Sequence, residues 1–507
     1  MQFNQFNNID NQVMNHENTP AYRLSPEWHL YASVVTSSLS DKFYEKASER
    51  LDIIWHLIRK TDPLFVARLA IYARERMNLR SIPLVLAVEL AKVHSGDTLV
   101  SRMTSRIIGR ADEITELLAY YQIANERNTN KKKKLNRLSK QLQAGLKIAF
   151  NKFDEYQFAK YNRDTTVTLR DALFLVHPKA KNEAQQLIFN KITENKLQTP
   201  YTWETELSAL GQSKFDTDIA KQKAFTRKWE ELTDSGKIGY MALLRNLRNI
   251  LESGVSFSHI QWVCETLSAK QKILQSKQLP FRFLAAYREL SKIKSDFTNK
   301  VVQTLEDAVK IAAENIAGFD ESTSVLIACD VSGSMQQPVS PKSKIMNYDI
   351  GLMLGMLLKS RCKNVVSGIF GDKWKIVELP NSGVLSNVDA FYKREGEVGY
   401  STNGYLVIED LIKKEKTVDK IMMFTDCQLW NSCGGNTQLK DVWKKYKTFA
   451  PDAKMYLFDL AGHGNSPLDI TSDDAHLIAG WSDKVFDILQ AIDNGSDALK
   501  EINAIEI

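Results

Sequence analysis

The chain has 507 residues, too many for one hydrophobic core, so its length predicts about three to four domain-sized units, or fewer if part of it is a repeat array. Its hydrophobic residues make up 43% and its charged residues 25%, which is ordinary for a globular protein. No window reaches the roughly 18 unbroken apolar residues that a membrane helix requires, and the polar, Asn- and Gln-rich start lacks the features of a signal peptide. These features predict a cytoplasmic protein without a membrane partner.

The positive charge is concentrated in the first part of the chain. The net charge is +6, yet residues 321–507 hold 20 Lys and Arg against 25 Asp and Glu, so residues 1–320 carry +11. An excess of basic residues in one part suggests an anionic partner there, nucleic acid being the commonest, although solvated helix faces account for such a charge as well. The five cysteines fit reduced thiols, and Cys427 and Cys433 are close enough in sequence for a redox pair to remain open.

The long segment 25–320 has the periodicity of helices. Apolar residues recur at helical spacing in 41–60, 62–77 and 81–93, and Asp62-Pro63 is a typical helix start. Short amphipathic helices joined by brief turns predict an α-solenoid of HEAT-like helix pairs, without a strict repeated motif. We therefore divide the chain into a polar N-terminal segment (1–24), a helical-repeat domain (25–320) and a C-terminal domain (321–507).

The periodicity changes at Ser324, where short apolar runs begin to alternate with helical patterns. The expected strands are 325–330, 365–371, 375–380, 421–426 and 454–462. Continuous apolar strands that alternate with helices predict a doubly wound, parallel α/β sheet covered on both faces. In such folds, ligands bind at the carboxyl ends of the strands.

Oxygen-bearing side chains gather at three of these strand ends and loops. Asp330, Ser332 and Ser334 follow the first strand, and alternate residues of an extended loop point to the same side. Thr402 precedes a helix, and Asp426 ends another strand. Carboxylate and hydroxyl oxygens suit a divalent cation such as Mg²⁺, whereas zinc prefers Cys or His. This pattern resembles a von Willebrand factor A (vWA) domain with its metal-ion-dependent adhesion site (MIDAS).

The same residues are compatible with further roles. Asp330 could act as a phosphatase-type nucleophile, but Ser332 stands where that family has a second acid. Ser332 or Ser334 could be an activated nucleophile, with His463 as the histidine on a comparable strand end. The hydroxyls could instead cap the following helix. We expect no enzymatic activity from this site.

Several segments, taken together, resemble the TROVE family, the Ro ribonucleoproteins. The metal loop in 325–339 resembles the start of that family's C-terminal domain, and IGYMALLRNLRNIL (238–251) resembles its A-L-L-R-N-L helix. Segments 279–290, 168–182 and 107–121 resemble further helices of its array. In the second loop, Thr402 lacks the paired glycines common in the family, and an acidic turn is missing after Asp426.

The resemblance implies a fold and a function. It implies a ring of helical repeats whose ends are bridged by the vWA domain, binding small noncoding Y-like RNA on its outer surface and single-stranded ends of misfolded RNA in its central hole. The implied role is RNA quality control or decay, by a monomer that works with an exoribonuclease or another protein. His177 matches the histidine associated with Y RNA binding. Lys160 and Arg163 lie in the basic segment before it, and Lys179 and Lys181 extend the patch by charge.

A function of another class stays open beside this one. The chain would then be a metal-dependent protein-interaction scaffold, because the open coordination position of a Mg²⁺ ion can accept the carboxylate of an acidic partner residue.

Overall fold

The structure is a computed structural model. The residues that it describes are 12–15, 17–37, 49–126, 138–162, 165–312, 314, 319, 322–339, 343–381, 383–432 and 437–507. The chain divides into two compact units, one formed by residues 1–36 and 239–498 and the other by residues 37–238 and 499–507. We call them the sheet unit and the helical unit. In the described residues, none of the helices has the length and apolar character needed to cross a membrane.

The helical unit is built from short helices, as the periodicity predicts. Several begin at a side-chain cap, such as Asp62, which accepts a hydrogen bond from the Leu64 amide ahead of Pro63. Its helices are α2 (Glu49–Ile58), α3 (Pro63–Glu75), α4 (Ser81–Val93), α5 (Leu99–Ile107), α6 (Ala111–Glu126), α7 (Lys140–Phe150), α8 (Glu155–Tyr161), α9 (Leu169–Val176), α10 (Glu183–Thr193), α11 (Trp203–Gly211), α12 (Asp218–Asp234) and most of α23 (Ala498–Asn503).

The last residues of the chain pack in the helical unit rather than with the sheet. Arg68 on α3 donates from Nε to the Ile505 carbonyl at 3.0 Å, and Arg102 on α5 donates to the Ile507 carbonyl at 2.9 Å. The segment 499–507 is therefore fixed by arginines that lie some 400 residues earlier in the chain.

The sheet unit also contains helices of the predicted helical array. These are α13 (Tyr240–Ser253), α14 (Phe257–Ser268), α15 (Lys270–Ser276), α16 (Phe281–Leu290) and α17 (Thr298–Ala312). Its α/β part adds α18 (Asn347–Lys359), α19 (Leu385–Tyr392), α20 (Tyr405–Lys413), α21 (Leu439–Phe449), α22 (Val485–Asp493) and the 3₁₀ helices η3 (Gly333–Gln336) and η4 (Glu395–Glu397).

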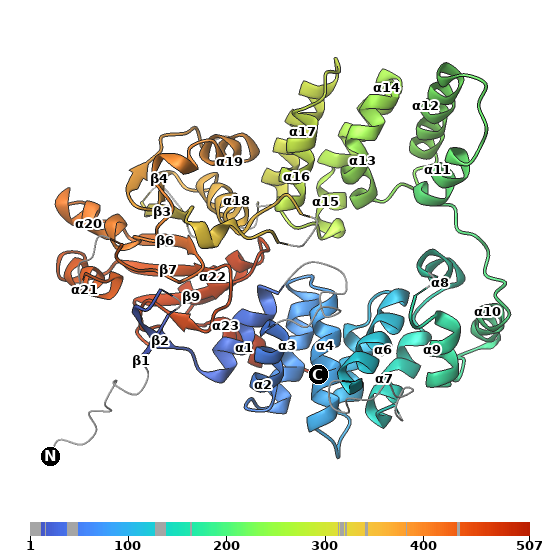
Figure 1. Ribbon diagram of the computed structural model, residues 1–507, viewed down its shortest axis with the longest axis horizontal. Helices are drawn as coiled ribbons and strands as arrows, with labels where there is room; N and C mark the ends of the chain where they lie inside the picture. The colour runs from blue at the N-terminus through green and yellow to red at the C-terminus, as the bar shows by residue number, and fades with distance from the viewer. Residues whose placement is uncertain are drawn as a thin grey trace. The chain divides into compact units, whose positions relative to one another are not determined.

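The six-stranded sheet has the order β5-β4-β3-β6-β7-β9, and Figure 1 shows β4, β3, β6, β7 and β9 side by side in that order. Its strands are β3 (Ser324–Asp330), β4 (Asn364–Phe370), β5 (Trp374–Ile376), β6 (Lys420–Thr425), β7 (Lys454–Asp459) and β9 (Ala475–Ala479). All pairs are parallel except β4 with β5. The prediction of a wholly parallel sheet was therefore wrong at this edge, because the turn between β4 and β5 is too short for the crossover that a parallel strand requires.

Helices cover both faces of this sheet, which buries both sets of alternating strand side chains. On one face, Leu326 and Ala328 of β3 share a core with residues of α20 and α21. On the other face, α18 packs against β3 so closely that a Cβ at Gly355 would lie 3.0 Å from Cys329 Sγ. The buried β3 strand therefore delivers its last residue, Asp330, to a fixed place at the carboxyl edge.

A second, three-stranded sheet joins the start of the chain to the C-terminal α/β part. Strand β1 (Gln12–Met14) pairs antiparallel with β2 (Pro20–Arg23), and β2 pairs antiparallel with β8 (Asn465–Ser466). Helix α1 (Pro26–Val35) follows and contacts β9. Part of the polar N-terminal segment therefore forms an ordered hairpin, which its composition did not indicate.

Candidate functional site

The five predicted metal ligands lie on three segments near the carboxyl edge of the sheet. Asp330 ends β3, Ser332 and Ser334 follow it at the start of η3, and Asp426 comes directly after β6. Asp330 and Asp426 are each 1% exposed, Ser332 and Thr402 are buried as well, and Ser334 is half-buried. Such burial of carboxylates is uncommon unless their charge is compensated.

Hydrogen bonds fix the carboxylate of Asp330 from two sides. Its Oδ1 accepts the Ser332 amide N–H at 2.9 Å, and its Oδ2 accepts the Thr425 hydroxyl at 2.6 Å. Ser332 Oγ lies 3.2 Å from Ser334 Oγ. The first segment is therefore pre-ordered, and its two hydroxyls lie next to each other.

The other two segments are tied to the first and to each other. The Thr402 hydroxyl donates to the Gln428 carbonyl at 3.0 Å, and the Trp430 amide donates to the Thr402 carbonyl at 3.3 Å. The Gly333 amide donates to the Tyr400 carbonyl at 2.9 Å, which joins the serine segment to the threonine segment. The structure therefore links the three segments that carry the predicted ligands.

The two buried carboxylates act on each other electrostatically. Burial is the main cause that raises the pKa of Asp330 to about 7, and the negative charge of Asp426 is the second. The hydrogen bonds from Ser332 and Thr425 lower this pKa and so oppose the two effects only in part. A cation between them would offset both the desolvation and the repulsion of the two charges.

The donor set fits a hard divalent cation. Two carboxylates and three hydroxyls are the oxygen ligands that Mg²⁺ accepts, usually together with water. The Thr402 hydroxyl uses its proton in the bond to Gln428, so its oxygen lone pairs stay available for a cation. Within the described residues no cluster of three or more His, Cys, Asp or Glu side chains is placed to hold a metal, so a zinc-type centre is not indicated there.

The alternative roles of these residues gain little support from the structure. Ser332 stands at the N-cap of η3, yet its side chain makes no cap hydrogen bond, so capping does not account for it. His463 is exposed in the loop between β7 and β8, whereas Ser332 is buried and its hydroxyl lies next to that of Ser334. The structure therefore does not pair the Ser332 hydroxyl with the imidazole of His463.

Asn403 joins two of the segments around the site, a role that the sequence did not predict. It is fully buried, donates to the Asp372 carbonyl at 3.2 Å and to Ser432 Oγ at 2.7 Å, and accepts the Ser432 amide at 2.8 Å. This one amide thus ties the threonine segment to the segment after β6. In the sequence, its position directly after the predicted ligand Thr402 could have pointed to this role.

Cys427, next to Asp426, has an unusual backbone. Its φ is +62°, a left-handed conformation that side chains other than Gly, Asn and Asp seldom adopt. Burial and three nearby aspartates raise the pKa of its thiol well above the usual value, which keeps it protonated. The four cysteines that the structure describes are free thiols. Cys433, the other half of the predicted redox pair, lies outside the described residues.

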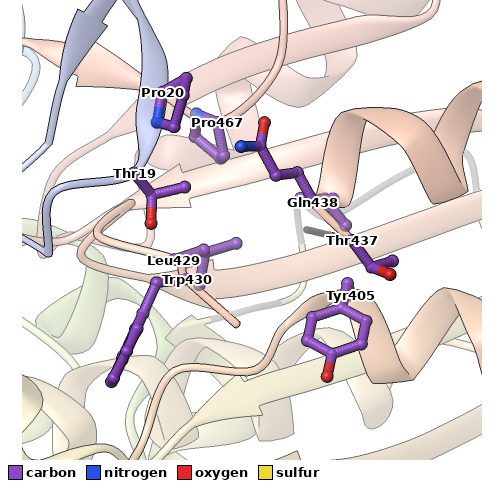
Figure 2. Close-up of a pocket in the computed structure, with 9 residues that line it drawn as sticks. Thr19, Pro20, Tyr405, Leu429, Trp430, Thr437, Gln438 and Pro467 are labelled. Carbon is purple, nitrogen blue, oxygen red and sulfur yellow. The ribbon is translucent and has the colours of Figure 1, made fainter. Parts of the chain in front are cut away.

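A small pocket lies beside the segment that follows Asp426 (Figure 2). It is lined by residues of the N-terminal hairpin, of that segment, of the starts of α20 and α21 and of the chain just after β8, namely Thr19, Pro20, Tyr405, Leu429, Trp430, Thr437, Gln438, Leu439 and Pro467. The hairpin and the metal segment are therefore neighbours in space.

Three of the predicted RNA contacts lie on one turn of the helical unit. His177 ends α9 in a left-handed conformation with φ of +50°, and its side chain is exposed. Lys179 and Lys181 are exposed along the same turn. Asn151 pins this turn, because its side chain donates to the Lys179 carbonyl at 2.9 Å and accepts the Lys181 amide at 2.8 Å. Asn151 was not foreseen from the sequence.

The remaining predicted RNA contacts are only partly described. Lys160 is exposed at the end of α8, with its ammonium 5.6 Å from the ring of Tyr161. Helices α8 and α9 both pack against α6, which places their ends on one helical scaffold. Arg163 lies outside the described residues.

Known proteins share both the sequence pattern and the fold. The family model described as TROVE domain matches residues 32–195 and 193–327. Telomerase protein component 1 is 25% identical over 317 residues in Rattus norvegicus and 25% over 319 residues in Mus musculus, which is 47% of this chain in each case. The match spans 12% of those much longer proteins.

A solved structure extends the likeness to most of the chain. The Ro (RSR) protein of Deinococcus radiodurans matches with a TM-score of 0.58 at 17% identity, over 93% of this chain and all of that one. This comparison shows a shared fold, with helices followed by an α/β sheet.

Proposed function

Because the chain belongs to the TROVE-domain family, we propose that it is an RNA-binding ribonucleoprotein component of Ro type. The observation that supports this proposal is the basic turn at the end of α9, where exposed His177 matches the histidine of the family resemblance and exposed Lys179 extends the patch by charge. The surplus of Lys and Arg in residues 1–320 supplies a matching electrostatic attraction for phosphates.

The finer proposal concerns the kind of RNA. We infer that small noncoding, Y-like RNA binds on the outer surface of the helical repeats, and that single-stranded ends of misfolded RNA enter a central hole. A ring of limited width would admit a single strand but exclude a duplex, so selection would act on a free end rather than on a base sequence. Such a protein would serve RNA quality control or decay as a cytoplasmic monomer, with an exoribonuclease or another protein as its partner.

We assign different roles in RNA binding to the basic residues on and near this turn. Lys160, His177 and Lys179 offer a cation or a ring donor to phosphates. The Lys181 ammonium already donates to the Asn151 carbonyl at 2.7 Å, so we assign Lys181 a role in shaping the turn as well as in its charge.

The test replaces Lys160 by Ala and His177 by Gly in one variant. Glycine accepts the left-handed conformation at position 177, so the helix end keeps its shape while the imidazole is lost. The matched control is Lys223→Ala with Asn195→Gly, which removes an exposed lysine from α12 and a side chain from another left-handed position.

The probe is a small structured RNA with a single-stranded 3′ end, compared with the same RNA made blunt. We expect the His177 variant to bind at least tenfold more weakly, the control variant to bind as the unchanged chain does, and affinity to fall steeply with salt. Equal binding by all three proteins would place the RNA elsewhere on the chain.

The linked metal segments favour a second candidate function. We propose that the sheet unit contains a vWA domain whose metal site holds a divalent cation, Mg²⁺ by its ligand chemistry, through Asp330, Ser332, Ser334, Thr402 and Asp426. The bound cation would supply a Lewis-acidic position for the carboxylate of an acidic partner residue. Recovery of a protein partner with Mg²⁺, lost with Asp330→Ala while RNA affinity stays unchanged, would support this function, whereas recovery independent of Mg²⁺ would contradict it.

A further inference from the structure

The hairpin at the start of the described chain contacts segment 426–430, which follows β6. Asn15, at the turn after β1, is 6% exposed and donates from Nδ2 to the Leu429 carbonyl at 3.0 Å. Its Oδ1 accepts the Glu17 and Thr19 amides at 3.0 and 2.9 Å, so the same side chain also shapes the hairpin turn. One asparagine therefore joins the hairpin to the segment 426–430.

A second, independent connection reaches the same segment. Strand β2 pairs Arg23 with Asn465 on β8, and the Asn465 side chain accepts from Gln428 Nε2 at 3.0 Å. Gln428 in turn donates its amide to Asp426 Oδ1 at 3.0 Å and offers its carbonyl to the Thr402 hydroxyl. Three successive contacts, through Asn465 and Gln428, thus connect the hairpin to two predicted metal ligands.

Helix α1 holds the neighbouring loop in place. Ser33 donates to the Gly462 carbonyl at 3.3 Å, and the Leu24 amide donates to the Gly464 carbonyl at 3.1 Å. The packing is close, because a Cβ at Gly462 would lie 2.8 Å from the Ala32 carbonyl oxygen. The loop that leads into β8 is therefore clamped between α1 and the sheet.

The pocket shows how the hairpin and the metal segment meet. Thr19 and Pro20 of the hairpin line it together with Leu429 and Trp430, and Figure 2 shows these side chains around one space. The segment 426–430 has an unfavourable backbone at Cys427, so it needs contacts from outside to hold its conformation.

From these contacts we propose that the N-terminal hairpin, described for residues 12–15 and 17–23, is a positioning element of the divalent-cation site, acting on Asp426 and Thr402 through Asn15 and Asn465. The proposal rests on the metal site proposed above. Partners that orient metal ligands commonly change metal affinity ten- to a hundredfold when they are lost. The hairpin would therefore set how tightly the cation binds, without contacting it.

The experiment measures Mn²⁺ binding to the full chain by calorimetry and by electron paramagnetic resonance. The variants are Asn15→Asp and Asn15→Ala. Asn15→Asp keeps an oxygen for the Glu17 and Thr19 amides but replaces the donor to Leu429, so it isolates the connection to the metal segment. The matched control is Asn246→Ala, which removes a buried asparagine of α13 that donates to the Ala242 carbonyl at 2.8 Å.

We expect both Asn15 variants to bind Mn²⁺ about tenfold more weakly and Asn246→Ala to bind as the unchanged chain does. Asp426→Ala should abolish binding. Unchanged affinity in both Asn15 variants, with loss in Asp426→Ala, would overturn the role of the hairpin alone. Absence of Mn²⁺ binding by the unchanged chain would overturn the metal site itself, and the inference with it. Circular dichroism of each variant distinguishes loss of a ligand position from loss of the fold.

Discussion

At the scale of residues, one buried ion pair joins two helices of the sheet unit. Arg288 of α16 donates to both oxygens of Asp349 on α18, at 3.0 and 2.6 Å, and Asp349 is fully buried. The same guanidinium lies 4.7 Å from the ring centre of Tyr392. The ion pair thereby fixes α16, a helix of the predicted repeat array, to α18, the helix that follows Asp330, Ser332 and Ser334 in the chain.

Arg288→Ala should lower the free energy of unfolding by about 3 kcal/mol, because it leaves a buried carboxylate without its partner. The matched control is Arg248→Ala, whose ion pairs with Glu252 and Glu289 are exposed, and we expect a change below about 1 kcal/mol there. Urea unfolding of both variants measures the difference, and similar losses in the two would show that the buried pair is not special.

His476 on β9 should make stability depend on pH. Burial lowers the pKa of the His476 imidazole below its usual value of about 6.5, and the positive charge of Lys454 has a smaller effect in the same direction. Near pH 6.5 the folded chain therefore keeps this imidazole neutral, whereas the unfolded chain already binds a proton there. The contribution of His476 to stability is therefore complete above about pH 7.5 and falls as the pH drops through about 6.5. The unfolding free energy of the unchanged chain minus that of His476→Gln should decrease from pH 8 to pH 5. A constant difference would contradict the lowered pKa.

At the scale of elements, one helix supplies the cap of another. Helix α19 begins after Val384, whose side chain cannot cap it. Glu306 of α17 does so instead, since its carboxylate accepts the amides of Val384, Leu385 and Ser386 at 3.0, 3.1 and 2.7 Å. Unpaired amides at a helix start attract a negative charge, and here that charge comes from the end of the helical array.

Glu306→Ala should lower the unfolding free energy by about 2 to 3 kcal/mol, because three amides lose their acceptor. Glu306→Gln keeps one oxygen and should cost less. Asp307→Ala, on the same helix but exposed, serves as the control with an expected change within about 0.5 kcal/mol. If the Ala variants at 306 and 307 are equally stable, Glu306 does not act as the cap.

The sequence predicted those elements whose pattern is local. Strand β3 was predicted correctly because a continuous apolar run ends on Asp330, whereas the metal ligands proposed after it remain a prediction. The hairpin was missed because its polar strands depend on pairing, β1 with β2 and β2 with β8, and β8 lies far away in the sequence. The roles of Asn15, Asn151 and Asn403 were missed for the same reason, since each joins segments that are distant in sequence or depends on the shape of a loop.

At the scale of the whole molecule, contacts between protein groups hold the residues of the candidate metal site. Asp330 is held by Ser332 and Thr425, and Thr402 by Gln428. The strands beneath are buried on both faces. A Mg²⁺ ion that keeps waters would add modest stability to such a frame.

Chelation with EDTA should therefore leave the fold intact. We expect the thermal unfolding midpoint to shift by less than about 3 °C, measured by circular dichroism with and without EDTA and with Mg²⁺ restored. Unfolding of the whole sheet unit on chelation would identify a structural ion in place of a binding site at the rim.

The pairing of β2 with β8 has a consequence for how the protein is made. Tyr22 leaves the ribosome 444 residues before Ser466, the residue opposite it. At about 5 to 20 residues per second, the nascent hairpin waits roughly 20 to 90 s for its partner strand. During that time the apolar side of α1 has no β9 strand to pack against, so this side stays exposed to chaperones until residues 465–479 have been synthesised.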